Sequence, residues 1–265
     1  VLMAQFPSKE IAQKSYDYRT LGLGFANIGG YLMSSGIPYD SPEGRSLCAA
    51  ISALMTGTSY ATSALISKEL GSFPKYKNNS SHMIRVIKNH RNAAYGKTEG
   101  YDKLSILPVP LLESECQDKE LINSAKLAWD NAFKLGVQYG FRNAQTTVIA
   151  PTGTIGLIMD CDTTGIEPDF ALVKFKKLAG GGYFKIINRI VPEALKTLGY
   201  NKEQRAKIEN YAVGHGTLKN CPEINENTLR EKGFSDEQFT LLESSLSSAF
   251  DIKFVFNRYT FGDHF

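Results

Sequence analysis

The residues that could do chemistry gather in one short stretch, residues 146–156, whose sequence is Thr-Thr-Val-Ile-Ala-Pro-Thr-Gly-Thr-Ile-Gly. Its β-branched start predicts a strand, and Pro151 predicts the end of that strand because proline cannot donate a ladder hydrogen bond. Gly153 and Gly156 let the backbone approach a ligand closely, and the neighbouring threonines add hydroxyl groups. Successive backbone N–H groups in such a turn can bind a phosphate-sized anion, more strongly where a helix begins.

Two segments that partly match nucleotide-binding motifs also have simpler interpretations. The turn lacks the lysine of a Walker A loop, so it also fits an ordinary strand-to-helix connection capped by threonine. Gly22-Leu23-Gly24 has the start of a dinucleotide fingerprint, but the pattern GxGxxG would need glycine where Asn27 stands. Close backbone packing is therefore the preferred interpretation of these two glycines.

Composition sets the outer limits. The 265 residues are 42% hydrophobic and 22% charged, which is enough for one large core or two small ones. The net charge of +3 is too mild to imply nucleic-acid binding, and the short basic clusters at 85–91 and 174–177 are interpreted as solvated faces. We therefore expect no nucleic-acid partner.

Cysteine usage and hydropathy suggest a compartment. The four cysteines form no CxxC motif and no zinc-like spacing with histidine, so we predict no metal site and a reducing, cytoplasmic setting. No apolar run is long enough to span a bilayer, so no membrane association is expected. The abrupt first residues, beginning at Val1, suggest a piece of a longer polypeptide.

The elements that must position the turn follow from caps, stops and periodicity. Helices are expected near residues 8–16, 26–35, 42–70, 80–96, 119–139, 183–198, 203–212, 224–231 and 235–248. The helix at 80–96 is expected to be capped by Ser80 or Ser81, after a turn-rich loop at 73–79. Short strands are expected at 142–149 and 169–175, and residues 19–25 are expected to be either a strand or a tight packing segment. A loop with three glycines is expected at 180–182. Helices alternating with a few buried strands indicate the α/β class, with too few strands to close a sheet.

Several segments taken together resemble a known family. They are, in chain order, residues 19–24, 142–147, 150–156, 159–164, 165–168 and 169–184. This set is similar to the C-terminal half of the catalytic barrel of ribonucleotide reductase large chains, in the adenosylcobalamin-dependent (class II) branch. The likeness covers essentially the whole chain.

The resemblance implies a fold. The family has a ten-stranded α/β barrel built from two antiparallel halves of five parallel strands. On that basis residues 1–200 are expected to be the C-terminal half of this barrel, and residues 201–265 a mostly helical extension of the same domain.

The resemblance also implies a reaction. In the family a thiyl radical, whose formation is initiated by adenosylcobalamin, removes the 3′-hydrogen of a ribonucleotide, and a pair of cysteines then reduces the 2′-carbon. Partners implied for the full-length protein are a ribonucleoside di- or triphosphate, a thioredoxin-like reductant and a second copy in a homo-oligomer. The sequence does not distinguish diphosphate from triphosphate.

Site residues carry over only where the motif matches. The resemblance assigns substrate-phosphate binding to Pro151, Thr152, Gly153, Thr154, Ile155 and Gly156. It assigns no catalytic residue, because the thiyl cysteine and the redox pair are expected before Val1. The isolated chain is therefore expected to be inactive.

Other candidates receive structural interpretations. Cys161 is interpreted as a small packing residue and Glu167 as a salt-link or hydrogen-bonding residue. Neither His90 nor His215 is predicted to bind a metal or cobalamin. The alternative function left open is a stand-alone nucleotide- or anion-binding module without catalysis.

Overall fold

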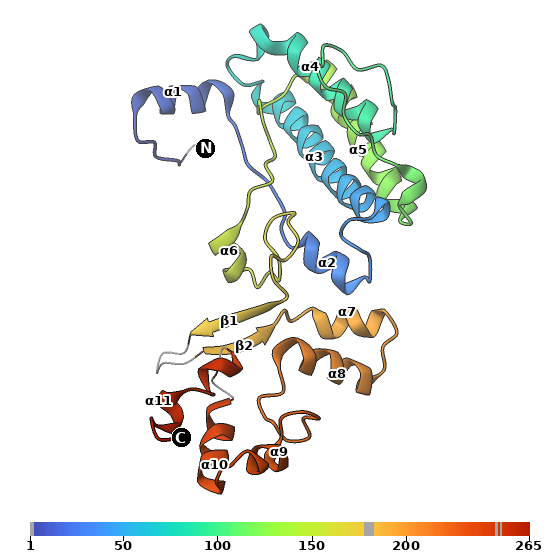
Figure 1. Ribbon diagram of the computed structural model, residues 1–265. Helices are drawn as coiled ribbons and strands as arrows, with labels where there is room; N and C mark the ends of the chain where they lie inside the picture. The colour runs from blue at the N-terminus through green and yellow to red at the C-terminus, as the bar shows by residue number, and fades with distance from the viewer. Residues whose placement is uncertain (1–2, 178–182, 247–248, 250) are drawn as a thin grey trace. The chain divides into compact units, whose positions relative to one another are not determined.

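A computed structural model describes residues 3–177, 183–246, 249 and 251–265. The chain divides into two compact units (Figure 1). Unit 1 comprises Val1–Met33 and Ile37–Pro168, and unit 2 comprises Ser34–Gly36 and Asp169–Phe265. No helix in the described part of the chain is both long enough and apolar enough to cross a membrane.

Unit 1 consists mainly of helices, which carry the labels of Figure 1. They are α1 (Lys9–Tyr18), α2 (Ile28–Ser34), α3 (Pro42–Leu70), α4 (Tyr76–Ala94), the 3-10 turn η1 (Glu113–Glu115), α5 (Lys119–Tyr139) and α6 (Gly153–Ile158).

The bounds of α3 and α5 confirm the sequence prediction, and local chemistry explains why. Ser41 accepts a hydrogen bond from the Gly44 N–H, Pro42 occupies the first turn, and Gly71 follows the helix at φ 78°. In the same way Asp118 caps α5 through the Leu121 N–H. Each end is specified by a few neighbouring residues.

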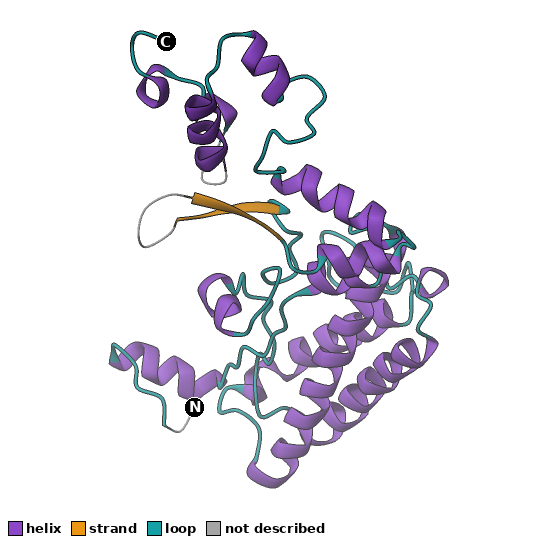
Figure 2. Ribbon diagram, turned by 90° about the horizontal axis from the view of Figure 1, so that it is seen from below, coloured by secondary structure: helices purple, strands orange, loops and turns teal. Residues whose placement is uncertain are grey.

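Helices α3, α4 and α5 lie side by side and form the core of unit 1 (Figures 1 and 2). Trp129 on α5 is 2% exposed and packs with Tyr60 of α3, Ile87 of α4 and Phe141. A Cβ on Gly57 of α3 would lie only 3.0–3.1 Å from atoms of the α5 residues Ala128 and Trp129, so a small residue lets the two helices approach closely.

One helix start was predicted wrongly. Helix α4 begins at Tyr76 rather than at a cap formed by Ser80 or Ser81. The Ser80 hydroxyl instead donates to the Lys77 carbonyl within the helix. The packing of Tyr76 against Phe73 and Phe141, at centroid distances of 5.3 and 6.3 Å, extends the helix into the sequence interpreted as a loop.

The two candidate strands of unit 1 form only one isolated bridge. Leu23 and Thr147 pair in parallel, with the Leu23 N–H donating to Thr146 O at 3.0 Å and the Val148 N–H to Leu23 O at 2.8 Å. A Cβ on Gly24 would lie 2.3 Å from the Val148 carbonyl oxygen, so the close packing predicted for this glycine is confirmed. The rest of residues 142–149 forms no regular strand, although the Leu21 N–H donates to Gln145 O and the Ala144 N–H to Tyr18 O, both at 2.9 Å.

Unit 2 begins with a β-hairpin. Strands β1 (Val173–Lys177) and β2 (Tyr183–Ile187) are antiparallel, with Val173 opposite Ile187. The helix predicted over 183–198 is therefore wrong in its first half. Residues 183–187 pair with β1, and the helix α7 (Val191–Thr197) starts only after that. The glycines at 180–182 lie outside the described residues.

The remainder of unit 2 is helical, as predicted. Its helices are α8 (Lys202–Val213), α9 (Glu226–Glu231), α10 (Asp236–Leu246), the 3-10 turn η2 (Ile252–Phe254) and α11 (Arg258–Phe261). Asn201 and Asn225 form capping boxes at α8 and α9. A separate core gathers around Leu218, Leu229, Leu242 and Val255.

The α/β expectation is thus met only in part. Among the described residues the sheet has two strands, and the structure is mainly helical. The division predicted at residue 200 concerned parts of one domain and stays a prediction.

Candidate functional site

The predicted phosphate turn links the extended segment to helix α6. Thr152 precedes the helix in the left-handed conformation, at φ 50° and ψ 44°. A β-branched residue rarely adopts this conformation, and such strain persists only where surrounding contacts hold it. Here the Thr152 hydroxyl accepts from the Gly165 N–H at 2.8 Å and donates to the Pro151 carbonyl at 2.8 Å.

The first turn of α6 presents unused backbone donors. The N–H groups of Gly153, Thr154 and Ile155 donate no hydrogen bond to any described residue, and all three residues are exposed. The Gly156 N–H, by contrast, donates to Thr152 O at 3.0 Å and closes the turn. A Cβ on Gly153 would meet nothing within 4 Å. Three of the predicted residues therefore offer free amides, and Gly156 has a structural bond instead.

The loop at 161–168 packs against α6 at both ends. At the start of the helix Gly165 contacts Thr152, and at its end the Cys161 N–H donates to Gly156 O at 2.9 Å. Gly165 has φ 47°, and a Cβ there would lie 2.8 Å from the Ala150 carbonyl. Only glycine fits this position without strain.

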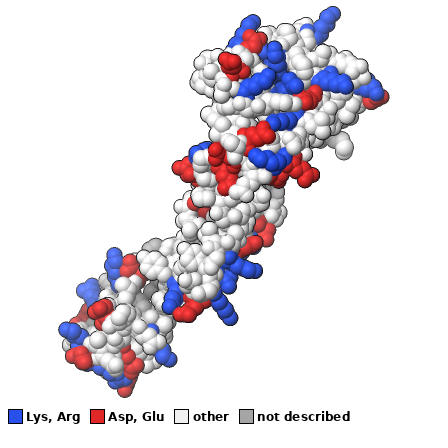
Figure 3. Space-filling model, turned by 90° about the vertical axis from the view of Figure 1, so that its right-hand side faces the viewer, with Lys and Arg blue, Asp and Glu red and all other residues white. Residues whose placement is uncertain are grey.

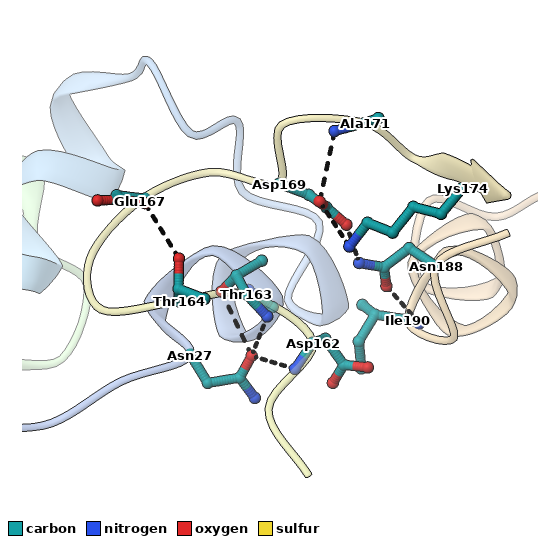
Figure 4. Close-up of polar contacts among 11 residues, drawn as sticks. Asn27, Asp162, Thr163, Thr164, Glu167, Asp169, Ala171, Lys174, Asn188 and Ile190 are labelled. Atoms are coloured by element: carbon teal, nitrogen blue, oxygen red, sulfur yellow. Dashed lines mark hydrogen bonds and ion pairs between the residues drawn. The ribbon is translucent and has the colours of Figure 1, made fainter. Parts of the chain in front are cut away.

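Asn27, which directly precedes helix α2, accepts hydrogen bonds from the same loop (Figure 4). Its Oδ1 accepts from the N–H groups of Asp162 and Thr163, both at 3.0 Å, and from the Thr163 hydroxyl at 3.3 Å. The Thr163 hydroxyl accepts in turn from the Gly30 N–H at 3.1 Å. Sequence analysis did not predict these contacts. The available signal was an asparagine directly before a helix, where its carbonyl accepts from the Tyr31 N–H.

Glu167 has the hydrogen-bonding role preferred for it. Its Oε2 accepts from the Thr164 hydroxyl at 3.0 Å, and its N–H donates to Thr164 O at 2.9 Å (Figure 4). The residue is exposed. Nothing in this arrangement makes it an acid poised for catalysis.

A second polar cluster belongs to unit 2 and fixes its hairpin (Figure 4). The Asp169 carboxylate accepts from the side chains of Asn188 and Lys174, the latter at 2.9 Å, and from the Ala171 N–H. Burial works to raise the pKa of Asp169, but these hydrogen bonds outweigh it and lower the pKa below its usual value. The interpretation of 174–177 as a solvated face is thus incomplete at Lys174.

Charges elsewhere are mixed. On the face drawn in Figure 3, acidic and basic side chains are interspersed. In the 85–91 cluster Arg91 is paired, with its Nε 2.6 Å from Asp130 Oδ1, and Tyr95 donates to the same carboxylate at 2.6 Å. These contacts join α4 to α5.

A cavity of about 340 Å³ lies elsewhere in unit 1, and no residue of the 151–156 turn lines it. Its walls include Tyr60, His90, Trp129, Gln145 and Thr147. The His90 ring stacks on Trp129, with centroids 5.1 Å apart and planes 4° apart. Desolvation by the surrounding atoms lowers the pKa of His90, although the ring still faces the cavity.

The cysteines show no redox arrangement. All four are free thiols in the described structure, and burial raises the pKa of Cys48 despite a hydrogen bond with Ser52. Cys161 is half-buried, close to Gly156. The described residues include no group of three His, Cys, Asp or Glu side chains placed to hold a metal ion.

Comparisons with known proteins now identify the family. The family described as "Ribonucleotide reductase, barrel domain" matches residues 1–231. A protein of Agrobacterium fabrum named vitamin B12-dependent ribonucleotide reductase is 64% identical over all 265 residues, which cover 21% of that relative. A protein of the same name from Rhodopirellula baltica is 42% identical over 252 residues, covering 95% of this chain and 22% of the relative.

A more distant relative extends the comparison. The ribonucleoside-diphosphate reductase subunit alpha of Chlamydia muridarum is 28% identical over 201 residues, covering 73% of this chain and 17% of the relative. The chain thus spans about a fifth of the length of each of these three relatives. It belongs to the ribonucleotide reductase family, in the part that the family describes as its barrel domain.

Proposed function

We propose that this chain acts within a vitamin B12-dependent ribonucleotide reductase, which reduces ribonucleotides to deoxyribonucleotides by thiyl-radical chemistry. The proposal is preferred to a stand-alone anion-binding module because identity of 64% to proteins named for this reductase extends over all 265 residues. A thioredoxin-like reductant, a homo-oligomeric state and a cytoplasmic location belong to the same proposal.

Within that protein the 151–156 turn would bind the substrate's phosphates. The observation that carries this role is the set of free, exposed N–H groups of Gly153, Thr154 and Ile155 at the start of α6. Their partial positive charges converge on one side of the turn, and the Thr154 hydroxyl adds a further donor. Holding the anionic end would fix the ribose for the radical step elsewhere in the protein.

Adenosylcobalamin, when bound to the complete protein, would supply the radical that starts the reaction. Two cavities among the described residues, of about 340 and 530 Å³, are small for a corrin ring and its arms. We therefore assign no residue of this chain to the cofactor and derive no step through it.

Substitution of Gly153 tests the phosphate role. A Cβ at this position meets open space in the protein, so Gly153→Val should fold normally and obstruct only a ligand. Losing one or two charge-assisted hydrogen bonds of about 1.5–3 kcal/mol each corresponds to a rise in the substrate KM of about tenfold to a hundredfold or more. The KM is measured with a ribonucleoside diphosphate in the complete protein that contains this chain.

The matched control is Lys202→Val, which introduces the same side chain at the exposed first position of α8. Its KM should equal that of the unmodified protein. A Gly153→Val protein with unchanged KM and unchanged thermal stability would remove the turn from the substrate site.

A further inference from the structure

The contacts of Asn27 suggest more than a local helix cap. Its Oδ1 receives three hydrogen bonds from Asp162 and Thr163, which lie 135 and 136 residues further along the chain. Asn27 itself has φ 71°, a left-handed conformation that asparagine tolerates better than most residues. One side chain thus fixes the backbone of a distant loop.

The loop and helix α2 pack so closely that a side chain larger than that of Gly29 would meet the loop. A Cβ on Gly29 would lie 2.7 Å from the Glu167 carbonyl oxygen and 2.8 Å from Thr163 Cγ2. Thr163 is 3% exposed, and its hydroxyl lies between Asn27 and the Gly30 N–H. The start of α2 and the loop therefore form one polar, closely packed contact.

The same loop bonds to the phosphate turn on both sides of the residues that Asn27 holds. The Cys161 N–H donates a hydrogen bond to Gly156 O at the end of the turn. The Gly165 N–H donates one to the hydroxyl of the strained Thr152 at its beginning. Asp162 and Thr163 lie between these two attachments. A shift of the loop would therefore move Thr152 and the free amides that follow it.

From this geometry we infer that Asn27 is a positioning residue for the 151–156 turn, acting through Thr163 and Gly165. It holds the strained Thr152 and the first turn of α6 in the conformation that receives phosphate. The inference rests on the proposed function of the turn. The experiment must therefore distinguish failure of the inference about Asn27 from failure of the phosphate role of the turn.

The test uses Asn27→Gly in the complete protein. Glycine adopts the left-handed backbone conformation readily, and the substitution removes the side chain that carries the acceptor oxygen. Misplacement of the turn by a fraction of an ångström to about 1 Å should raise the KM for a ribonucleoside diphosphate, and its Kd in equilibrium dialysis, by about 10- to 100-fold. A purely structural role would lower the folded fraction, and with it the apparent kcat, while leaving KM and Kd unchanged.

A matched pair at Thr163 covers the case in which Asn27→Gly fails to fold. Thr163→Val removes the hydroxyl and should raise KM and Kd, while Thr163→Ser retains it and should leave both within about twofold of the original values. Equal KM values for the valine and serine variants, or an unchanged KM for Asn27→Gly alongside a raised KM for Gly153→Val, would overturn the inference. An unchanged KM for Gly153→Val would instead count against the phosphate role of the turn itself.

Discussion

The helical bundle of α3, α4 and α5 and the turn region at 150–168 are stabilised by different means. In the bundle, large apolar side chains such as Trp129 and Ile87 are buried almost completely. In the turn region, the apolar residues Leu157 and Ile158 are 78% and 84% exposed, and the backbone is fixed by N–H groups that donate to the side chains of Asn27 and Thr152. Buried apolar side chains stabilise the bundle, whereas polar contacts and glycines determine the backbone conformation of the turn region.

The two regions should therefore respond differently to amino-acid substitution. Loss of apolar volume in the bundle costs stability, because the cavity that is left remains unfilled. Loss of a polar contact near the turn should alter its geometry, because hydrogen bonds rather than buried apolar volume fix the backbone there. Substitutions in the two regions should therefore differ in what they change, and the largest effect is expected in the bundle.

Trp129→Ala should give the largest loss of stability. Trp129 is the only tryptophan of the chain, and its removal leaves a cavity between α3, α4 and α5. The expected decrease in the free energy of unfolding is about 3–5 kcal/mol. Urea unfolding of the chain, followed by far-UV circular dichroism, measures it.

Leu157→Ala on α6 is the matched control in the turn region. It also removes an apolar side chain, but one that is mostly in contact with solvent. The change should stay within about 0.5 kcal/mol. A loss as large as that of Trp129→Ala would mean that α6 belongs to a core and would abolish the contrast between the regions.

Gly24→Ala should have a smaller, local effect at the junction of the two regions. The added Cβ would meet the Val148 carbonyl oxygen at 2.3 Å, and a backbone atom cannot move aside cheaply. We expect a loss of about 1–3 kcal/mol and faster hydrogen exchange at the N–H groups of Leu23 and Val148. Gly22→Ala is the control, since its Cβ would meet only the Val148 Cγ1 methyl group, at 2.9 Å.

The sequence predicted the bundle well because its signals are local. Ser41, Pro42 and Gly71 define α3 within a few residues of its ends, and spacing alone reveals the buried face of α5. The turn was recognised from its proline and glycines, whereas helix α6, which begins at Gly153, was not among the helices expected from the sequence.

What the sequence could not predict depends on distant partners. The hydrogen bond between Asn27 and Thr163 joins residues 136 positions apart, and no periodicity encodes it. The helix expected over 183–198 failed for a related reason, because pairing with β1 decides the conformation of residues 183–187. The strand expected at 142–149 was reduced to a single bridge, since strand structure requires neighbours.

The smallest expected effect is a pH dependence within the bundle. His90 stacks on Trp129, and desolvation lowers its pKa below the usual value of 6.5. The unfolded chain therefore binds a proton more readily than the folded chain. Stability should be complete at neutral pH and decline as the pH falls from 6.5 towards the lower pKa of the folded state, with no further loss from this group beyond it.

Because His90 is itself an exposed residue, solvent weakens this effect, and the slope should stay well below the limit of about 1.4 kcal/mol per pH unit for one proton. Unfolding by urea at pH 7.5 and 5.5, followed by Trp129 fluorescence, measures the difference. In His90→Gln the loss of stability between these two pH values should be smaller, while His82→Gln, which removes an exposed imidazole from the same helix, should leave it unchanged. Equal losses in the His90→Gln and original proteins would show that the stacked imidazole is not destabilised by its surroundings, and that the bundle tolerates a charge as readily as the exposed turn does.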